Sequence, residues 1–373
     1  MRGKLSPFDR SFFILTLILA LYGSLMVFSA GSAYAEFRYD DKFFFVTRQF
    51  LWLVLGIGVM IFASRIKPSF YFTVTPYLYV ITISLLILVL AVGLVGNGAQ
   101  RWISIGPLTI QPSEIAKMTI VMALAYYFSV YEEKALERKN VKNKFIYGTL
   151  IPSAIIAVPI LLVMLQKHLS CIIILGLIGI LVIIASGIDT KYISVFTFIG
   201  GIGVACIALF TDYTKDRITV WRNPEGYKLT GGWQTLQGLM AIGSGGLFGL
   251  GYGNSILKYC YVSEPANDMI FAILCEELGF VGALFTITLF TLFTIRGYKL
   301  SLDAENVFER LVIFGVCTKI AVQFLLNIAV VTNTIPNTGI SLPFFSYGGS
   351  SLIMIFFEIG MILSFSRNAK ITK

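Results

Sequence analysis

The chain has 373 residues, of which 57% are hydrophobic and only 13% are charged. A soluble fold of this size would have too little polar surface to cover its core, so the composition excludes an ordinary soluble protein and favours a membrane protein. The net charge of +9 would suit a nucleic-acid partner. We expect no such partner, because the positive residues lie mainly in the loops between apolar segments, where membrane topology explains them.

Apolar segments long enough to cross a hydrocarbon core recur from Phe12 almost to Phe365. Backbone groups in lipid must be hydrogen-bonded within the segment, and these segments lack the alternating pattern of a barrel, so they predict helices. The expected fold class is all-α, a polytopic membrane protein with about ten transmembrane helices in one domain over residues 1–373. The predicted helices are 11–31, 48–64, 71–95, 112–131, 148–165, 169–187, 192–211, 266–294, 308–333 and 346–366.

The distribution of lysine and arginine predicts the orientation. With the N-terminus inside, the cytoplasmic segments carry 17 of these residues and the outer segments carry ten. Because cytoplasmic loops are usually enriched in positive residues, we expect both termini to be cytoplasmic. Ala33-Tyr34-Ala35 resembles a signal-peptidase site, but the preceding apolar run is long enough to span. We therefore expect an uncleaved, multi-pass membrane protein.

One outer segment, 212–265, separates the seventh and eighth predicted helices and is rich in Gly, Arg, Tyr and Trp. It is too long to be a mere connection, so we expect it to hold structure of its own, with short interfacial helices. The stretch 234–243 has helical spacing and is expected to lie at the interface or to re-enter the membrane. The glycine-rich stretch 243–254 permits close backbone approach, but it lacks Walker or Rossmann spacing, so phosphate binding is not favoured.

Charged side chains inside predicted helices are candidate functional residues, because they are costly in lipid unless they face a polar interior. Glu114 and Lys117 follow Pro112 at a predicted helix start, where a local ion pair explains them as well as a function does. Glu276 and Glu277 point about 100° apart on a helix, so at least one of them must find an internal partner.

A polar stripe on the predicted helix 308–333 consists of Lys319, Gln323 and Asn327, which recur every fourth residue. Such a stripe either lines a wet cavity or joins helices. Lys319 is about 21 Å from the outer end of its helix, and Glu358 is about 18 Å from the outer end of the last helix. The similar depths predict a buried ion pair between them, with Glu277 as the alternative partner.

Cations gather in the predicted outer segments, against the usual insertion bias. An anionic lipid headgroup or a pyrophosphate would explain them, with simple snorkelling at the membrane surface as the alternative. The cations are Arg48, Arg101 beside Trp102, Lys215, Arg217, Arg222 and Lys228.

Asp268 lies where the long outer segment turns into the eighth predicted helix. It could be an ordinary N-cap, kept ionised by the helix dipole. It is also a carboxylate at the water interface facing a cationic segment, where a base acting on a sugar hydroxyl would be needed.

Several motifs occur in order along nearly the whole chain: FFFVTRQ at 43–49, GAQRWI at 98–103, QPSEIAK at 111–117, AIGSGGLFG at 241–249, NDMIFAI at 267–273, EELG at 276–279 and PFFSYGGSS at 343–351. Together they resemble the SEDS family (shape, elongation, division and sporulation), the membrane proteins FtsW, RodA and SpoVE. The expected outer-loop start 28–33 and the segment 167–170 look more like the division and sporulation branch than the elongation branch.

The resemblance implies a peptidoglycan glycosyltransferase. Such an enzyme polymerises lipid II, the undecaprenyl-pyrophosphate-linked disaccharide pentapeptide, into β-1,4-linked glycan strands with inversion, for cell division, sporulation or cell shape. The implied partners are a class B penicillin-binding protein, which is a transpeptidase, and other divisome or elongasome membrane proteins. Asp268 is then the catalytic residue. The resemblance places Arg48, Arg101, Trp102, Glu114 and Lys117 at the substrate, and the group of outer cations adds Arg217 and Arg222.

Two positions depart from the family pattern. Lys167-His168 stands where many members have Pro-Asp, so no role is assigned to that turn, and Asn267 replaces the usual Thr before Asp268. The alternative function is a lipid II flippase, since a polar-lined bundle could serve either purpose. The outer cations and the long segment 212–265 both lie on the predicted outer side of the membrane. This one-sided distribution favours the enzyme over the flippase. A need for Mg²⁺ or Mn²⁺ is left open, and the five cysteines, none in CxxC spacing, predict no metal site.

Overall fold

The computed structural model describes residues 8–96, 99–105, 108–136, 141–188, 212–259 and 261–367. Its α-helices are α1 Arg10–Tyr39, α2 Phe44–Ala63, α3 Pro68–Val92, α4 Pro112–Leu136, α5 Val141–Phe145, α6 Ile151–Leu165, α7 Leu169–Ala185, α9 Asp212–Arg222, α10 Trp233–Gly245, α11 Ile270–Asp303, α12 Val307–Val331 and α13 Gly349–Ser366. Short elements complete the described chain: strands β1 Leu94–Gly96, β2 Ala99–Ile105 and β3 Leu108–Ile110, the π-helical turn η1 Ile146–Leu150 and the 3₁₀ turn η2 Glu225–Tyr227.

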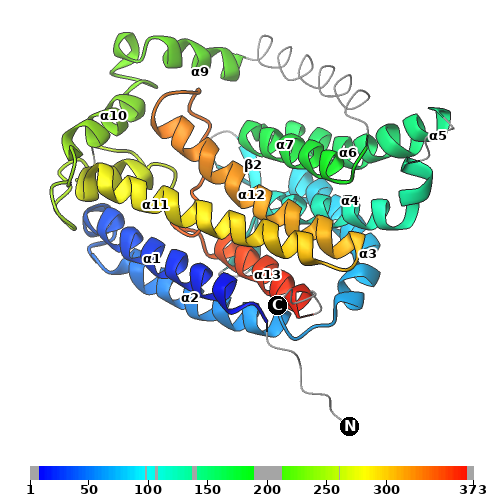
Figure 1. The fold of residues 1–373 in the computed structure, drawn as a ribbon. Helices are drawn as coiled ribbons and strands as arrows, with labels where there is room; N and C mark the ends of the chain where they lie inside the picture. Colours follow the sequence, from blue (N-terminus) through cyan, green and yellow to red (C-terminus); the bar gives the residue numbers. More distant parts are fainter. Residues whose placement is uncertain are drawn as a thin grey trace.

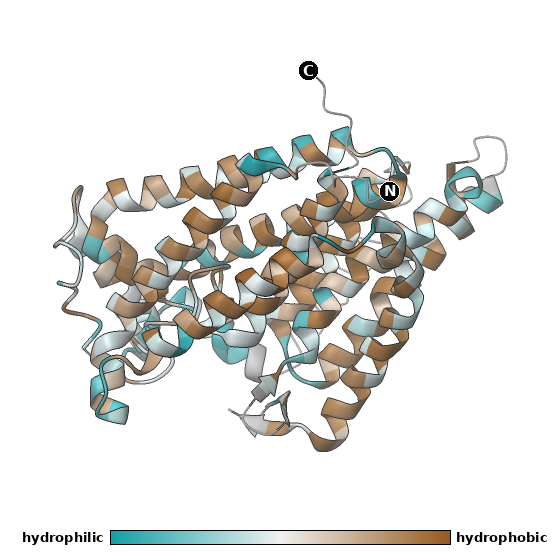
Figure 2. Ribbon diagram, turned by 90° about the horizontal axis from the view of Figure 1, so that it is seen from below, coloured by the Kyte–Doolittle hydropathy of each residue, from teal (hydrophilic) through white to brown (hydrophobic). Residues whose placement is uncertain are grey.

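Seven helical segments in the described part of the chain are long and apolar enough to cross a membrane: α1, α2, α3, η1 with α6, α11, α12 and α13. The apolar α7 is shorter, at 17 residues, and α4 packs between α3, α7 and α12. Hydrophobic residues cover the long helices, whereas hydrophilic residues gather at helix ends and in the short helices (Figure 2). The chain is thus an all-α, multi-pass membrane protein, as predicted. The helix predicted at 192–211 lies outside the described residues.

The bundle has two distinct ends (Figure 1). At one end, Asp9 before α1 forms an ion pair with Arg296 of α11, and its backbone N–H donates to Ser366 at the end of α13. We call this the termini end. The opposite end, which we call the site end, carries the small sheet, α9, α10, the start of α11 and the connection between α12 and α13.

The helix α12 lies at the centre of the bundle, against α4, α7, α11 and α13. In its apolar stretch 67% of the residues are buried, against 22% for α2 and α3, which therefore leave most of their surface to lipid. The polar stripe on α12 consequently lies inside the protein, where its side chains must find protein partners.

One predicted feature of the site end is wrong. Residues 28–33 do not begin a loop, because α1 continues to Tyr39 and ends at Asp40, which has a left-handed φ of 54°. The connection between α3 and α4 contains the small sheet, in which β2 pairs antiparallel with both β1 and β3. Because neighbouring side chains in a strand point to opposite faces, Arg101 and Trp102 point in opposite directions.

The helix α11 is interrupted at Gly279, whose φ of 65° is outside the helical region. The backbone of residues 246–251 pairs with that of residues 276–281 through hydrogen bonds of 2.9–3.1 Å. This pairing satisfies the polar groups that the break would leave open in a membrane. A Cβ added at Gly249 (φ 77°) would lie 2.1 Å from the carbonyl oxygen of Glu277. The glycine-rich stretch therefore completes a broken membrane helix.

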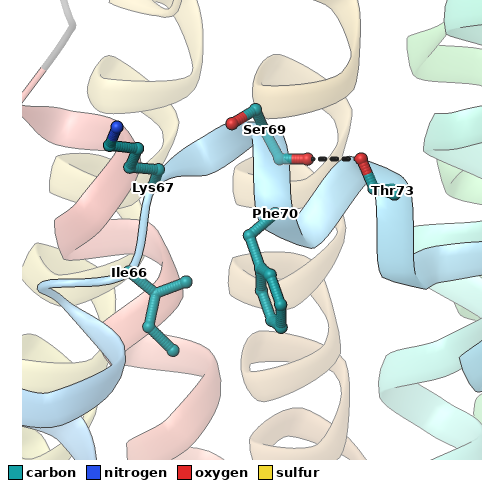
Figure 3. A pocket seen from close by; sticks show the side chains of 5 residues that line it. All are labelled: Ile66, Lys67, Ser69, Phe70 and Thr73. Carbon is teal, nitrogen blue, oxygen red and sulfur yellow. Dashed lines mark hydrogen bonds between the residues drawn. The ribbon is translucent and has the colours of Figure 1, made fainter.

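A pocket of about 450 Å³ lies at the turn between α2 and α3, at the termini end (Figure 3). Ser364 of α13 donates to a carbonyl of this turn, and Thr73 donates to the carbonyl of Ser69 at 3.0 Å. Lys67 is the one charged residue in its lining, and the pocket is at the end of the bundle opposite the predicted site residues. The lining residues are Ile66, Lys67, Ser69, Phe70 and Thr73.

Candidate active site

The candidate site is organised around residues 332–348, between α12 and α13, which we call the hub segment. Five side chains donate to its main-chain carbonyls: Ser170 of α7, Arg217 and Trp221 of α9, and Gln323 and Asn327 of α12. An irregular segment inside a bundle needs such donors, because its carbonyls would otherwise be unpaired. The polar stripe on α12 therefore joins structural elements.

Asp268 lies in the turn before α11 and is half-buried. Its Oδ2 accepts a hydrogen bond from Gln234 Nε2 at 3.4 Å, and it lies 3.7 Å from where a Cβ on Gly339 of the hub segment would be. Its Oδ1 is buried without a hydrogen-bond partner among the described residues. The Asp268 carbonyl accepts from Asn327 at 2.8 Å. Asn327 thus fixes the backbone, and Gln234 holds the carboxylate through Oδ2.

The N-cap interpretation of Asp268 is wrong. The helix α11 begins at Ile270, four residues later than predicted, and its N-cap is Met269, with no capping bond from a side chain. The Asp268 carboxylate is therefore free of the structural role that would have explained it without a function.

The helix dipole was expected to lower the pKa of Asp268 and keep it ionised, and the expectation of a lowered pKa is also wrong. The pKa of the Asp268 carboxyl is raised to about 6, mainly by burial and also by the charge of Glu264, while the backbone N–H of Asp268 itself, Gln234 and Arg217 oppose the rise. A carboxylate with this pKa is mostly ionised at neutral pH and is a better proton acceptor than an ordinary aspartate, as general base catalysis requires.

Two amide residues that sequence analysis did not assign to the site surround Asp268. Gln234 comes from α10, and Asn337 of the hub segment donates from Nδ2 to Gln234 Oε1 at 3.1 Å. Arg217 of α9 donates to the Asn337 carbonyl, and Trp221 donates to the hub segment at 2.9 Å. The sequence shows amide residues in the predicted outer segments, which could have suggested this role. Gln234 and Asn337 are too far apart in the chain for any sequence spacing to link them to Asp268.

A second polar group lies at the start of α4. Glu114 and Lys117 form the predicted ion pair at 2.7 Å. Lys117 Nζ also donates to Gln323 Oε1 at 3.3 Å, and Ser351 of α13 donates to Glu114 at 3.4 Å. Since Gln323 also donates to the hub segment, this pair and the surroundings of Asp268 are joined through the same segment.

Arg101 reaches from β2 to the turn between α6 and α7, where its Nη2 donates to the carbonyl of Lys167 at 2.6 Å. His168 in this turn lies 3.5 Å from the Ser113 hydroxyl at the start of α4. Burial, followed by the charges of Arg101 and Lys117, lowers the pKa of His168 to about 3, so the imidazole is neutral at physiological pH. The structure therefore brings Arg101, Glu114 and Lys117 to one side of the hub segment.

The predicted buried ion pair between Lys319 and Glu358 is confirmed. Their exposed fractions are 2% and 0%, so both charges are taken out of solvent. Glu277, the alternative partner, lies elsewhere in the bundle.

Both glutamates of the EELG motif have internal partners, where at least one was predicted to. Glu277 pairs with Lys258 at 3.0 Å and accepts from Ser29 of α1 at 2.6 Å. Glu276 accepts from the backbone N–H groups of residues 256 and 257. Together they fix the glycine-rich stretch against the break in α11, a role that sequence reasoning missed because Lys258 was counted only as an outer cation.

Three predicted substrate-binding residues lie outside these polar groups. Arg48 is exposed at the start of α2, and its guanidinium is 3.7 Å from the centre of the Phe44 ring. Trp102 is 37% exposed on β2, and Arg222 is exposed in the last turn of α9. Their roles stay predictions.

The described ranges contain no group of three His, Cys, Asp or Glu side chains that could hold a metal ion. Cys171, Cys275 and Cys317 are free and buried, and Cys206 and Cys260 lie outside the described residues.

The fold and the site define a multi-pass membrane protein with a polar site at one end, built around an aspartate with a raised pKa. The model of the Cell cycle protein family that comprises FtsW, RodA and SpoVE matches residues 9–371. This chain therefore belongs to the FtsW/RodA/SpoVE family, as its motifs indicate.

Relatives and solved structures match over almost the whole chain. Stage V sporulation protein E of Bacillus subtilis is 38% identical, over 98% of this chain and 99% of its own length. The probable peptidoglycan glycosyltransferase FtsW of Geobacter sulfurreducens is 31% identical, over 98% and 97%. A chain of a peptidoglycan synthase complex superposes with a TM-score of 0.80 at 26% identity, over 98% and 99%. RodA of Thermus thermophilus gives 0.71 at 26%, over 97% and 98%.

Proposed function

We propose that this protein is a peptidoglycan glycosyltransferase that polymerises lipid II on the outer face of a bacterial cytoplasmic membrane. The observation that carries the proposal is Asp268, a half-buried carboxylate of raised pKa whose Oδ1 has no partner among the described residues. The relatives named as peptidoglycan glycosyltransferases and the similar chain of a peptidoglycan synthase complex support it. The site end then faces outward, and both termini are cytoplasmic.

In the proposed reaction, a sugar 4-hydroxyl of one lipid II attacks the anomeric carbon of a second, lipid-linked sugar. The new C–O bond forms on the face opposite the departing group, so an α-linkage becomes a β-1,4 linkage. The bond from the anomeric carbon to the pyrophosphate oxygen breaks, and its electron pair stays with the lipid pyrophosphate. Asp268 accepts the hydroxyl proton as bonding develops, which typically contributes a factor of about 10² to 10⁴ in rate.

The leaving pyrophosphate needs charge neutralisation rather than an acid. Arg101 donates to a neutral carbonyl, so that contact leaves its positive charge available to an anion. Lys117 is paired with Glu114, so this pair adds hydrogen-bond donors with little net charge. We assign Arg101, Arg217 and the more exposed Arg48 and Arg222 to the pyrophosphate.

The test is Asp268→Asn, which keeps the size of the side chain and removes the base. Purified protein in nanodiscs is given labelled lipid II, and the products are separated on a gel. We expect normal insertion and lipid II binding, with polymerisation reduced by at least about 100-fold. If the variant makes polymer at near the wild-type rate, Asp268 is not the base, and Glu114 is the next candidate.

A class B penicillin-binding protein is the proposed partner, with other divisome or elongasome membrane proteins around it. Gly279 and Gly282, which could have packed against a partner helix, are both buried within this chain. Such a partner must therefore use other lipid-facing surface. Co-purification with the transpeptidase in mild detergent tests this assignment, and failure in both detergent and nanodiscs would count against it.

The flippase alternative requires a polar path between the two faces of the membrane. In the described bundle Glu114 pairs with Lys117 and Lys319 with Glu358, so these four charges are neutralised within the protein, which favours a closed interior. Lipid II transport by the Asp268→Asn variant in vesicles, measured beside polymerisation, separates the two functions.

A further inference from the structure

The two oxygens of the Asp268 carboxylate have different surroundings. Oδ2 accepts from the Gln234 amide at 3.4 Å, whereas Oδ1 is buried with no partner in the part of the chain that the structure describes. A carboxylate can rotate about its Cβ–Cγ bond, and a bond to one oxygen restricts that rotation. The bond from Gln234 therefore restricts the orientation of the carboxylate.

Gln234 can donate to Asp268 only if its amide has the correct orientation, because the flipped amide would bring its oxygen against the carboxylate. Asn337 selects this orientation by donating from Nδ2 to Gln234 Oε1 at 3.1 Å. The Asn337 amide is itself fixed, since its Oδ1 accepts from the backbone N–H of Gly339 at 3.1 Å. Its carbonyl accepts from Arg217. These hydrogen bonds thus fix the orientation of both amides, Asn337 and Gln234, between the hub segment and Asp268.

We propose that Gln234, oriented by Asn337, is a positioning residue that holds the Asp268 carboxylate through Oδ2. The inference rests on the proposed function, in which Asp268 is the base. Asp268 and Gln234 are 34 residues apart, and Gln234 and Asn337 are 103 apart, so only the folded site joins them.

The bond from Gln234 has a measurable effect on protonation, because a donor to a carboxylate stabilises its ionised form. The other groups acting on the carboxylate are the negative Glu264, the positive Arg217 and the backbone N–H of Asp268 itself, and the Asn327 amide of α12 donates to the Asp268 main-chain carbonyl. We expect Gln234→Ala to raise the apparent pKa of Asp268 by about one unit. From a starting value of about 6, the rate should fall about fivefold at pH 6, about twofold at pH 7, and hardly at all above pH 8.

The activity test measures lipid II polymerisation by the full-length protein in nanodiscs from pH 5.5 to 8.5. Gln234→Ala should move the acid limb of kcat to higher pH with little change in KM. Gln234→Glu should move it further, because this variant can still accept from Asn337 but places a carboxylate against Asp268. Met240→Ala, an exposed residue on the same helix, and Thr334→Ala, exposed in the hub segment, are matched controls and should leave the profile unchanged.

Asn337→Ala provides the test of the relay. If Asn337 acts through Gln234, the double variant Gln234→Ala/Asn337→Ala should be no worse than Gln234→Ala alone. Multiplied losses in the double variant would overturn the relay. Equal losses at every pH in Gln234→Ala would mean that Gln234 supports only the structure of the site.

A second readout does not depend on activity. The protein is labelled with ¹³C at aspartate carboxyls, and the Asp268 resonance is assigned by its loss in Asp268→Asn. An upward shift of its titration midpoint in Gln234→Ala supports the positioning contact even if no variant makes polymer, in which case only the proposed function fails. An unchanged midpoint in a protein that does make polymer refutes the positioning role and leaves the proposed function standing.

Discussion

Removing one charge of the Lys319–Glu358 pair should destabilise the protein more than removing both. Neither residue can move its charge to water, since the exposed fractions are 2% and 0%. Losing one partner of a buried pair costs about 3–5 kcal/mol, whereas apolar residues of similar volume in place of both are often neutral. Glu358 Oε1 has no further partner among the described residues, so Lys319→Met, which leaves the carboxylate alone, should reach the upper part of that range.

The assay is a double-mutant cycle of Lys319→Met and Glu358→Met in mixed micelles, with unfolding in a denaturing detergent followed by tryptophan fluorescence. Each single variant should lose about 3–5 kcal/mol and the double about 1 kcal/mol, which gives a coupling of at least about 5 kcal/mol. Lys142→Met, at an exposed lysine of α5, is the matched control and should change stability by less than about 0.5 kcal/mol. Single losses that simply add in the double variant would refute the reasoning.

Three further predictions concern the glycine-rich stretch, the topology and the catalytic aspartate. Gly249→Ala should cost at least about 2 kcal/mol, because its φ is 77° and an added Cβ would meet main-chain atoms across the break in α11. Gly243→Ala, where a Cβ meets nothing within 4 Å, should be neutral or stabilising in the same unfolding assay. Single cysteines at Lys142 and Lys228, in a background without the native cysteines, should label from the inside and the outside respectively, and labelling from one side would refute the topology. The wild-type pH–rate profile should rise with pH through about 6 as Asp268 loses its proton, and a limb below pH 5 would contradict the raised pKa.

Much of the architecture could be predicted from the sequence because the relevant physics is local. The hydrocarbon core sets the length of an apolar helix, so most spans were placed within a few residues. Depth along a helix follows from residue number, which is why Lys319 and Glu358 could be paired before the helices were packed. Asp268 could be selected because it is a carboxylate in a motif next to a predicted outer segment rich in cations. This selection did not depend on the N-cap interpretation, which was wrong.

The sequence by itself determined a multi-pass membrane protein, its family and the candidate catalytic aspartate, since length, hydropathy and ordered motifs are properties of the linear chain. Only the tertiary structure decided how that aspartate is held. The bonds from Gln234 to Asp268 and from Asn337 to Gln234 join three segments far apart in the chain, and Lys258 reaches Glu277 only because α11 breaks at Gly279. Hydrogen bonds and burial depend on distances between segments, and these distances exist only once the helices have packed.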